Sequence, residues 1–189
     1  NVAQTISTAP TTYGNLAITT GAATVIKSLG GATLNIAGNL TLSNALATLA
    51  GGANTINVTG NISGTGGLSF TSGTLNITGN NSQSGTFTCG TSTVNYQGVA
   101  ASQTVRGTTY YNLTILGSGN KNLGAATIVN NNVLISSGTL SVTASNRSLT
   151  IGGDFTNNSA FSGHSGTVTF NGSALQDIGG STSTTFYNL

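Results

Sequence analysis

The chain has 189 residues, of which only 3% are Asp, Glu, Lys or Arg, and its formal net charge is +2. Scattered positive charge of this size offers no basic patch for nucleic acid or an anionic membrane. No apolar run reaches the roughly 18 residues that a membrane-spanning helix needs. Hydrophobic residues make up 37%, and Ser and Thr number 56 beside 23 Asn. Because Thr, Val and Ile suit strands and strong helix formers are scarce, the composition predicts an all-β protein.

Short segments that alternate polar and apolar residues and end in glycine recur along the chain. The first four begin at Thr33, Thr55, Thr74 and Thr93, so their spacing is nearly constant. This pattern is typical of a half-buried strand followed by a turn. We expect Thr and Asn to face outward and the apolar members to face inward. The inward residues are then Leu34, Ile36, Ile56, Val58, Leu75, Ile77, Val94, Tyr96, Leu140, Val142, Val168 and Phe170.

A second alternating segment lies beside most of these, for example Leu40/Leu42, Leu68/Phe70 and Val133/Ile135. Two or three short strands in a period of roughly 20 residues are what one coil of a parallel β-solenoid requires. An antiparallel sandwich is the alternative, because its strands also follow one another at short spacing. The near-constant step and the scarcity of hairpin dipeptides favour the solenoid. We therefore predict a β-solenoid in which Leu34, Ile56, Leu75 and Val94 form one interior column.

A longer repeat is superimposed on the short one. Residues 92–113 return as residues 166–189, with Gln103 matched by Gln176 and Tyr111-Asn112-Leu113 matched by Tyr187-Asn188-Leu189. A partial copy occupies residues 1–16. We therefore predict one solenoid over residues 1–189, with internal modules at about 1–98 and 99–173 and with 174–189 starting a third copy.

Neither end of the sequence contains a segment that looks like a cap. Solenoid ends expose unpaired strand edges, and charged residues are the usual protection against pairing with another chain. Because Lys, Arg and Glu are absent from both terminal stretches, we expect uncapped ends that bind copies of the chain, or adjacent repeats, head to tail. A strand at 184–189 would pair with residues 1–16 of a neighbour. The expected interface residues are Val2, Gln4, Ile6, Tyr13, Leu16, Thr184, Phe186, Tyr187 and Leu189.

The side chains available for catalysis are few. Asp154 and Asp177 are separated by about one coil of the predicted solenoid and could lie on neighbouring coils, but each also suits a turn. His164 lies in a Gly- and Ser-rich turn without a second ligand nearby, and a zinc site needs three or four. Cys89 is expected to be a small buried hydrophobe. We therefore predict no enzyme activity, cofactor or metal site.

Five aromatic residues recur at one position of the long repeat: Tyr13, Tyr110, Tyr111, Phe186 and Tyr187. They could form an exposed platform for surface glycans, but we expect one of each pair to pack inside. A carbohydrate-binding or polysaccharide-cleaving β-helix is the alternative function. It requires these aromatic side chains and both Asp residues to share one exposed groove.

The segments TVNYQG…SQTVRGTTYYNLTI and TVTFNGSALQDIGGSTSTTFYNL resemble the β-strand repeats of very large secreted and surface proteins of Bacteroidota-like bacteria. The resemblance covers residues 89–189 well and residues 1–16 in part, whereas residues 17–88 resemble generic β-solenoid adhesin repeats. It implies an extracellular or cell-surface structural protein, a segment of a fibre or adhesin stalk, and it carries no catalytic residues.

Overall fold

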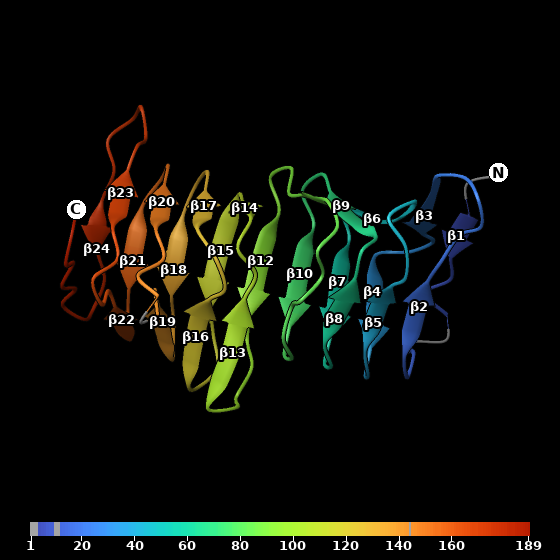
Figure 1. Ribbon diagram of the computed structural model, residues 1–189, viewed down its shortest axis with the longest axis horizontal. Helices are drawn as coiled ribbons and strands as arrows, with labels where there is room; N and C mark the ends of the chain where they lie inside the picture. The colour runs from blue at the N-terminus through green and yellow to red at the C-terminus, as the bar shows by residue number, and fades with distance from the viewer. Residues whose placement is uncertain (1–3, 10–11, 144) are drawn as a thin grey trace. The chain divides into compact units, whose positions relative to one another are not determined.

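The structure is a computed structural model that describes residues 4–9, 12–143 and 145–189. In this part of the chain every regular element is a strand. The chain divides into two compact units, residues 1–93 (unit 1) and residues 94–189 (unit 2). Each unit is a parallel β-solenoid, in which the chain visits three sheets in turn (Figure 1). The predicted fold class is confirmed.

Unit 1 has three parallel sheets, one for each side of its coil. The first contains β1 (Gln4–Ile6), β3 (Val25–Leu29), β6 (Ala47–Gly52), β9 (Gly67–Phe70) and β11 (Phe87–Thr88). The second contains β4 (Thr33–Ile36), β7 (Thr55–Val58) and β10 (Thr74–Ile77). The third contains β2 (Leu16–Ile18), β5 (Leu40–Leu42) and β8 (Ile62–Gly64).

The register in unit 1 is that of the short glycine-ended repeat. Leu34 pairs with Ile56, and Ile56 pairs with Leu75, so these three predicted neighbours form one column. All three side chains are fully buried. Val94, the fourth predicted member, is buried as the first residue of unit 2. Period-2 alternation therefore identified the inward face correctly.

Unit 2 has the same three-sided construction. Its first sheet contains β12 (Thr93–Tyr96), β15 (Asn112–Ile115), β18 (Val133–Ile135), β21 (Phe155–Asn157) and β24 (Ile178–Gly179). The second contains β13 (Ser102–Val105), β16 (Asn120–Leu123), β19 (Thr139–Ser141) and β22 (Ala160–Ser162). The third contains β14 (Thr109–Tyr110), β17 (Thr127–Val129), β20 (Leu149–Ile151) and β23 (Val168–Phe170).

The glycines that end the repeated segments of unit 1 stack at one corner of the coil. A Cβ on Gly60 would lie 2.5 Å from the carbonyl oxygen of Gly38, and one on Gly79 would lie 2.3 Å from that of Gly60. The Gly60 N–H also donates to the Gly38 carbonyl at 2.9 Å. The coils approach so closely at this corner that no side chain fits, which explains why each segment ends in glycine.

Two local expectations were wrong. Cys89 is partly exposed rather than buried, because β11, the strand just before it, is the last strand of its sheet and has a neighbour on one side only. The strand expected at 184–189 is reduced to an isolated bridge between Asn188 and Thr167. Residues 163–166 of the coil below form a turn, closed by a bond from Gly166 N–H to the Gly163 carbonyl. They offer no extended partner to the beginning of this segment.

Candidate functional site

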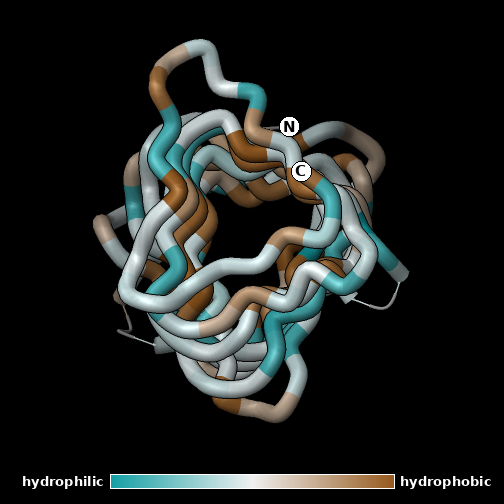
Figure 2. The backbone as a smooth tube through the Cα atoms, turned by 90° about the vertical axis from the view of Figure 1, so that its left-hand side faces the viewer, coloured by the Kyte–Doolittle hydropathy of each residue, from teal (hydrophilic) through white to brown (hydrophobic). Residues whose placement is uncertain are grey.

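The last coil of unit 2 ends in open strand edges. Each of β22, β23 and β24 is the terminal strand of its sheet, and in Figure 2 this end of the unit faces the viewer. Four apolar side chains are strongly exposed on this coil: Leu175 at 93%, Ile178 at 48%, Tyr187 at 68% and Leu189 at 74%. Gly, Ser and Thr make up most of the remaining residues at 171–189.

Four phenylalanines, here called the Phe cluster, pack beneath this surface. They are Phe155, Phe161, Phe170 and Phe186. The ring of Phe186 lies 5.6 Å from those of Phe155 and Phe161 and 5.9 Å from that of Phe170, measured between centroids. Phe155 is fully buried, whereas the other three are only half-buried. One side of the cluster is therefore incompletely covered.

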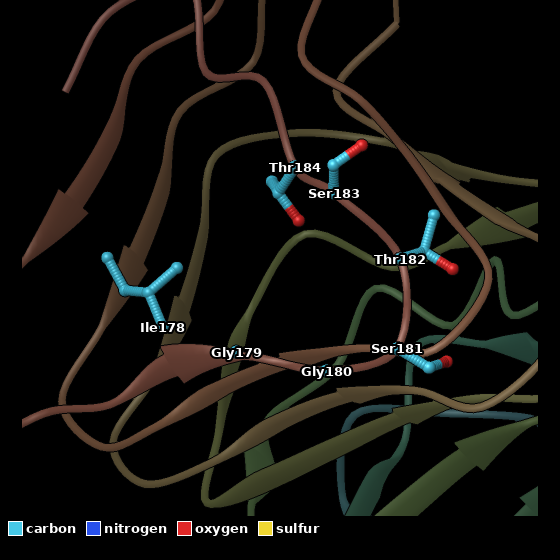
Figure 3. A pocket seen from close by; sticks show the side chains of 7 residues that line it. All are labelled: Ile178, Gly179, Gly180, Ser181, Thr182, Ser183 and Thr184. Atoms are coloured by element: carbon cyan, nitrogen blue, oxygen red, sulfur yellow. The ribbon is translucent and has the colours of Figure 1, made fainter.

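Two shallow hollows open on the same coil. One, of about 330 Å³, is lined by residues 178–184, from the end of β24 to Thr184 (Figure 3). The other, of about 380 Å³, is lined by residues 161–164 and 185–187 and includes Phe161, His164 and Phe186. Both are lined by uncharged or weakly basic side chains, and neither contains a carboxylate. Apolar groups and hydroxyls of a further coil would suit these hollows.

The first described coil of unit 1 is open in the same way. β1 and β2 are the terminal strands of their sheets, and Tyr13 forms an isolated bridge with Ile36 on the third side. Ile6, Tyr13 and Leu16 are half-buried, whereas Gln4 is exposed. Of the predicted interface residues, this group therefore lies on unit 1, whereas Thr184, Phe186, Tyr187 and Leu189 lie on unit 2. Val2 lies outside the described residues.

Side-chain oxygens at one corner of unit 1 bind the backbone of the next coil. Asn15 Oδ1 accepts the N–H of Asn39 at 2.7 Å, Asn39 Oδ1 accepts that of Asn61 at 2.8 Å, and Asn61 Oδ1 accepts that of Asn80 at 2.7 Å. We call this arrangement a corner ladder. Each rung runs in the same direction, from the N–H of a later coil to the oxygen of the coil before it. The ladder therefore has a chemical polarity along the solenoid.

Unit 2 has a corner ladder of the same polarity. Asn112 Oδ1 accepts the N–H of Asn132 at 3.3 Å, and Asn132 Oδ1 accepts that of Asp154 at 2.9 Å. Asp154 Oδ1 then accepts the N–H of Asp177 at 2.9 Å. The two Asp residues do lie on neighbouring coils, as the sequence suggested. They are rungs of the corner ladder, because the carboxylate of Asp154 accepts a backbone N–H.

A second ladder joins side-chain amides on the outer face of β4, β7 and β10. Asn57 Nδ2 donates to Asn35 Oδ1 at 2.7 Å, and Asn76 Nδ2 donates to Asn57 Oδ1 at 2.6 Å. These amides are half-buried. Stacked amides of identical residues fix the register between coils, as they do in other in-register parallel stacks.

The glutamine of the long repeat has one structural role in both repeats of unit 2. Gln103 Oε1 accepts the N–H of Gly98 at 3.0 Å, and Gln176 Oε1 accepts that of Gly172 at 2.7 Å. Gln176 Nε2 also donates to the Ile151 carbonyl at 3.1 Å. The matched glycine and glutamine therefore form a clamp that closes the loop between two strands.

These two repeats nevertheless occupy different sides of unit 2. Val94 lies in the sheet that ends in β24, whereas its counterpart Val168 lies in β23 of another sheet. Likewise, Gln103 lies in β13, whereas Gln176 directly precedes Asp177 and β24. The long repeat does not contain a whole number of coils. It is a local unit of about one coil that can be built on any side of the solenoid.

Sequence reasoning missed an interior lysine. Lys121 in β16 is fully buried, and its Nζ donates to the carbonyl oxygens of Gly98 at 2.8 Å and Ser118 at 2.5 Å. Burial lowers the pKa of Lys121. Lys121 pairs with Gln103 of β13, and the same Gln–Lys pairing occurs in unit 1, where Gln4 pairs with Lys27 and accepts a hydrogen bond from its Nζ. The sequence did contain an indication of this: Lys121 lies two residues before the inward-facing Leu123 in the same strand, so both side chains point to the same face.

Two buried tyrosines form a closed network with the backbone N–H and carbonyl of one residue. Tyr110 OH donates to the Arg106 carbonyl at 2.7 Å, and the Arg106 N–H donates to Tyr96 OH at 3.0 Å. The two hydroxyls are 2.9 Å apart. Because the Tyr110 proton is already used, Tyr96 must be the donor between them. Burial raises the pKa of Tyr110 well above its ordinary value. The expectation that one ring of each aromatic pair packs inside is confirmed for Tyr110, whereas Phe186 packs within the Phe cluster but is only half-buried.

The remaining polar candidates do not converge on a site. His164 is exposed in a turn, and burial raises the pKa of the Cys89 thiol. Within residues 4–9, 12–143 and 145–189, no three His, Cys, Asp or Glu side chains are close enough together to bind a metal ion. In the same part of the chain, no helix is both long and apolar enough to cross a membrane. Neither of the two hollows on the last coil is lined by Asp154 or Asp177, although one of them includes Phe186 and Tyr187.

Comparison with protein-family models, with curated proteins and with solved structures found no match for this chain. The functional conclusion therefore depends on the geometry of the two open coils.

Proposed function

We propose that this chain is a structural β-solenoid segment of an extracellular fibre or adhesin stalk, extended by further coils at both open ends. The main support is the last coil of unit 2, where Leu175, Ile178, Tyr187 and Leu189 are exposed and three members of the Phe cluster are only half-buried. Open strand ends that carry exposed apolar side chains are what a further coil would cover. The further coils are either other copies of the chain or adjacent repeats of a longer polypeptide.

The charge distribution supports this proposal. Neither the first described coil nor residues 178–189 contain Lys, Arg, Asp or Glu, and the nearest carboxylate to β24 is that of Asp177, just before it. Such edges lack the charged side chains that commonly prevent pairing with another sheet. A contact between two different ends is heterologous, so it produces an open filament when the coil axes align.

The decisive experiment measures the size of the purified chain as a function of concentration, by sedimentation velocity and negative-stain electron microscopy. We expect filaments from the full chain and monomers after deletion of residues 182–189. A matched pair of substitutions separates end contacts from general solubility. Ile178→Asp on the open coil should abolish filaments, whereas Ile128→Asp, at a residue of similar exposure (45%) on the outer face of β17, should not. Filaments that survive both the deletion and Ile178→Asp would refute the proposal.

The extracellular location has its own test. Antibodies raised against the folded chain should label intact, unpermeabilised cells of the source organism. Labelling only after permeabilisation would contradict it.

A further inference from the structure

The two open coils carry the same tripeptide pattern at equivalent places. Gln4-Thr5-Ile6 forms β1, and Gln176-Asp177-Ile178 leads into β24. Ile6 pairs with the inward-facing Leu29, and Ile178 pairs with the buried Phe155. Both tripeptides therefore turn Gln and Ile toward the interior, and the middle residue, Thr5 or Asp177, outward.

A second pair of matched residues follows at nearly the same distance along each coil. Asn15-Leu16 comes after Gln4 at the start of β2, and Asn188-Leu189 comes after Gln176, with almost the same number of intervening positions. In each case Gln lies on one side of the coil and Asn two sides further on. In unit 1, the bridge of Tyr13 occupies the side between β1 and β2. In unit 2, Asn188 bridges to Thr167 beside β23, two sides after β24. The coil at 4–16 could therefore lie directly over the coil at 176–189, side upon side.

The hydrogen-bonding groups at these two asparagines are complementary. Where the next coil is present in the chain, the Oδ1 of this repeat asparagine receives a backbone N–H from it: Asn15 from Asn39, and Asn112 from Asn132. Asn188 uses Nδ2 to bind the Ser165 carbonyl at 3.2 Å, and its Oδ1 has no partner among the described residues. The backbone N–H of Asn15 likewise has none there. In the described part of the chain, the open coil of unit 2 thus has an acceptor without a donor, Asn188 Oδ1. Within the same residues, the open coil of unit 1 has a donor without an acceptor, the Asn15 N–H, and together they would complete one rung.

We infer that the neighbour at the open end of unit 2 is a second copy of this chain, bound in one specific register. In this register Gln4, Thr5 and Ile6 of one copy pair with Gln176, Asp177 and Ile178 of the other, and the Asn15 N–H donates to Asn188 Oδ1. The inference rests on the proposed function and adds the partner and the alignment. Like residues stack on like, and the corner ladder of unit 1 gains one further rung, to Asn188 of the neighbouring copy, with its polarity unchanged.

Disulfide cross-linking tests this register. In a Cys89→Ser background, Thr5→Cys with Asp177→Cys places both thiols on paired, outward-facing positions of neighbouring parallel strands. Such strands are about 4.8 Å apart, within the Cα separation of about 4.4–6.8 Å that a disulfide accepts. The control pair is Ala17→Cys with Asp177→Cys, because Ala17 lies in β2 on another side of the coil. Mild oxidation of the filaments is followed by non-reducing electrophoresis.

We expect a ladder of covalent multimers from the Thr5/Asp177 pair and only monomer bands from the Ala17/Asp177 pair. Filaments that cross-link through Ala17, or through neither pair, would overturn this register while leaving end-to-end assembly intact. If no variant and no wild-type sample associates, the proposed function itself fails, and the inference with it. Asn188→Leu should raise the concentration needed for filament formation several-fold, whereas Asn130→Leu, at an exposed position directly after β17, should leave it unchanged.

Discussion

Gln103 and Gly98 are joined by a hydrogen bond of 3.0 Å from the glycine N–H to the glutamine Oε1, and both residues are buried. The same bond, at 2.7 Å, joins Gln176 and Gly172 on another side of unit 2. The glutamine is therefore retained in both repeats as a loop clamp. This hydrogen bond explains why the polar Gln103 occurs at an inward-facing position of β13.

Replacing Gln103 with Leu should lower the free energy of unfolding by about 1–3 kcal/mol, because the buried Gly98 N–H loses its acceptor. Thr104→Val is the control, since Thr104 is the exposed neighbour in the same strand and valine preserves strand propensity. Urea unfolding followed by circular dichroism provides the comparison. Equal stabilities for the two variants would show that the clamp contributes nothing.

Alanine at Gly60 should destabilise the chain, by about 1–3 kcal/mol for the overpacking of a tight contact. The added Cβ would lie 2.5 Å from the Gly38 carbonyl oxygen, which belongs to the backbone and cannot rotate away. Gly21→Ala is the matched control, since nothing lies within 4 Å of a Cβ at that position. That variant should be neutral or slightly more stable. A Gly60→Ala midpoint equal to that of Gly21→Ala would contradict the tight corner.

Aspartate at Ile77 should cost at least about 3 kcal/mol, because it places an unpaired charge in a fully buried position. Asn76→Asp should cost less, about 1–2 kcal/mol, since Asn76 faces outward but loses the donor that binds Asn57 Oδ1. Urea midpoints at neutral pH distinguish the two variants. Similar losses would mean that the inward and outward faces of β10 are assigned incorrectly.

Much of the fold could be predicted from the sequence because strand alternation reports directly which residues face inward. Leu34, Ile56 and Leu75 were placed in one column on this basis, and the structure confirms them. The constant direction of the repeats likewise gave the parallel pairing. The first inference depends on a period of two residues and the second on the near-constant step between repeats, and both can be read without knowledge of distant contacts.

The interior polar groups could not be predicted in the same way. Lys121 shares the inward parity of Leu123, but burying an amine requires acceptors, and these are carbonyls of Gly98 and Ser118 in loops. Loop length also decides which side of the solenoid a repeat occupies. The repeat at 166–189 lies in another sheet from the repeat at 92–113, and alternation within strands contains no information on that rotation.

Phenylalanine at Tyr110 should lower the free energy of unfolding by about 1–3 kcal/mol, because both the Arg106 carbonyl and the Tyr96 hydroxyl lose a partner in a buried site. Tyr111→Phe, next to it but only half-buried, is the control and should change stability by less than about 0.5 kcal/mol. Thermal and urea unfolding of both variants provide the measurement. If the tyrosine network contributed nothing to stability, Tyr110→Phe and Tyr111→Phe would have the same free energy of unfolding.

Stability should rise with pH at high pH because of Lys121. Burial lowers the pKa of Lys121 in the folded chain below its ordinary value of 10.5, so between these two values the unfolded chain binds more protons than the folded one. Stability increases with pH wherever the unfolded state binds more protons. The gain therefore accrues across this window and is complete above 10.5. Lys121→Met lacks the titrating amine, and every other titratable side chain is common to both proteins. The difference in unfolding free energy, wild type minus Lys121→Met, should consequently increase from pH 7 toward pH 10. A difference that stays constant or decreases over this range would show that the amine is not desolvated in the folded chain.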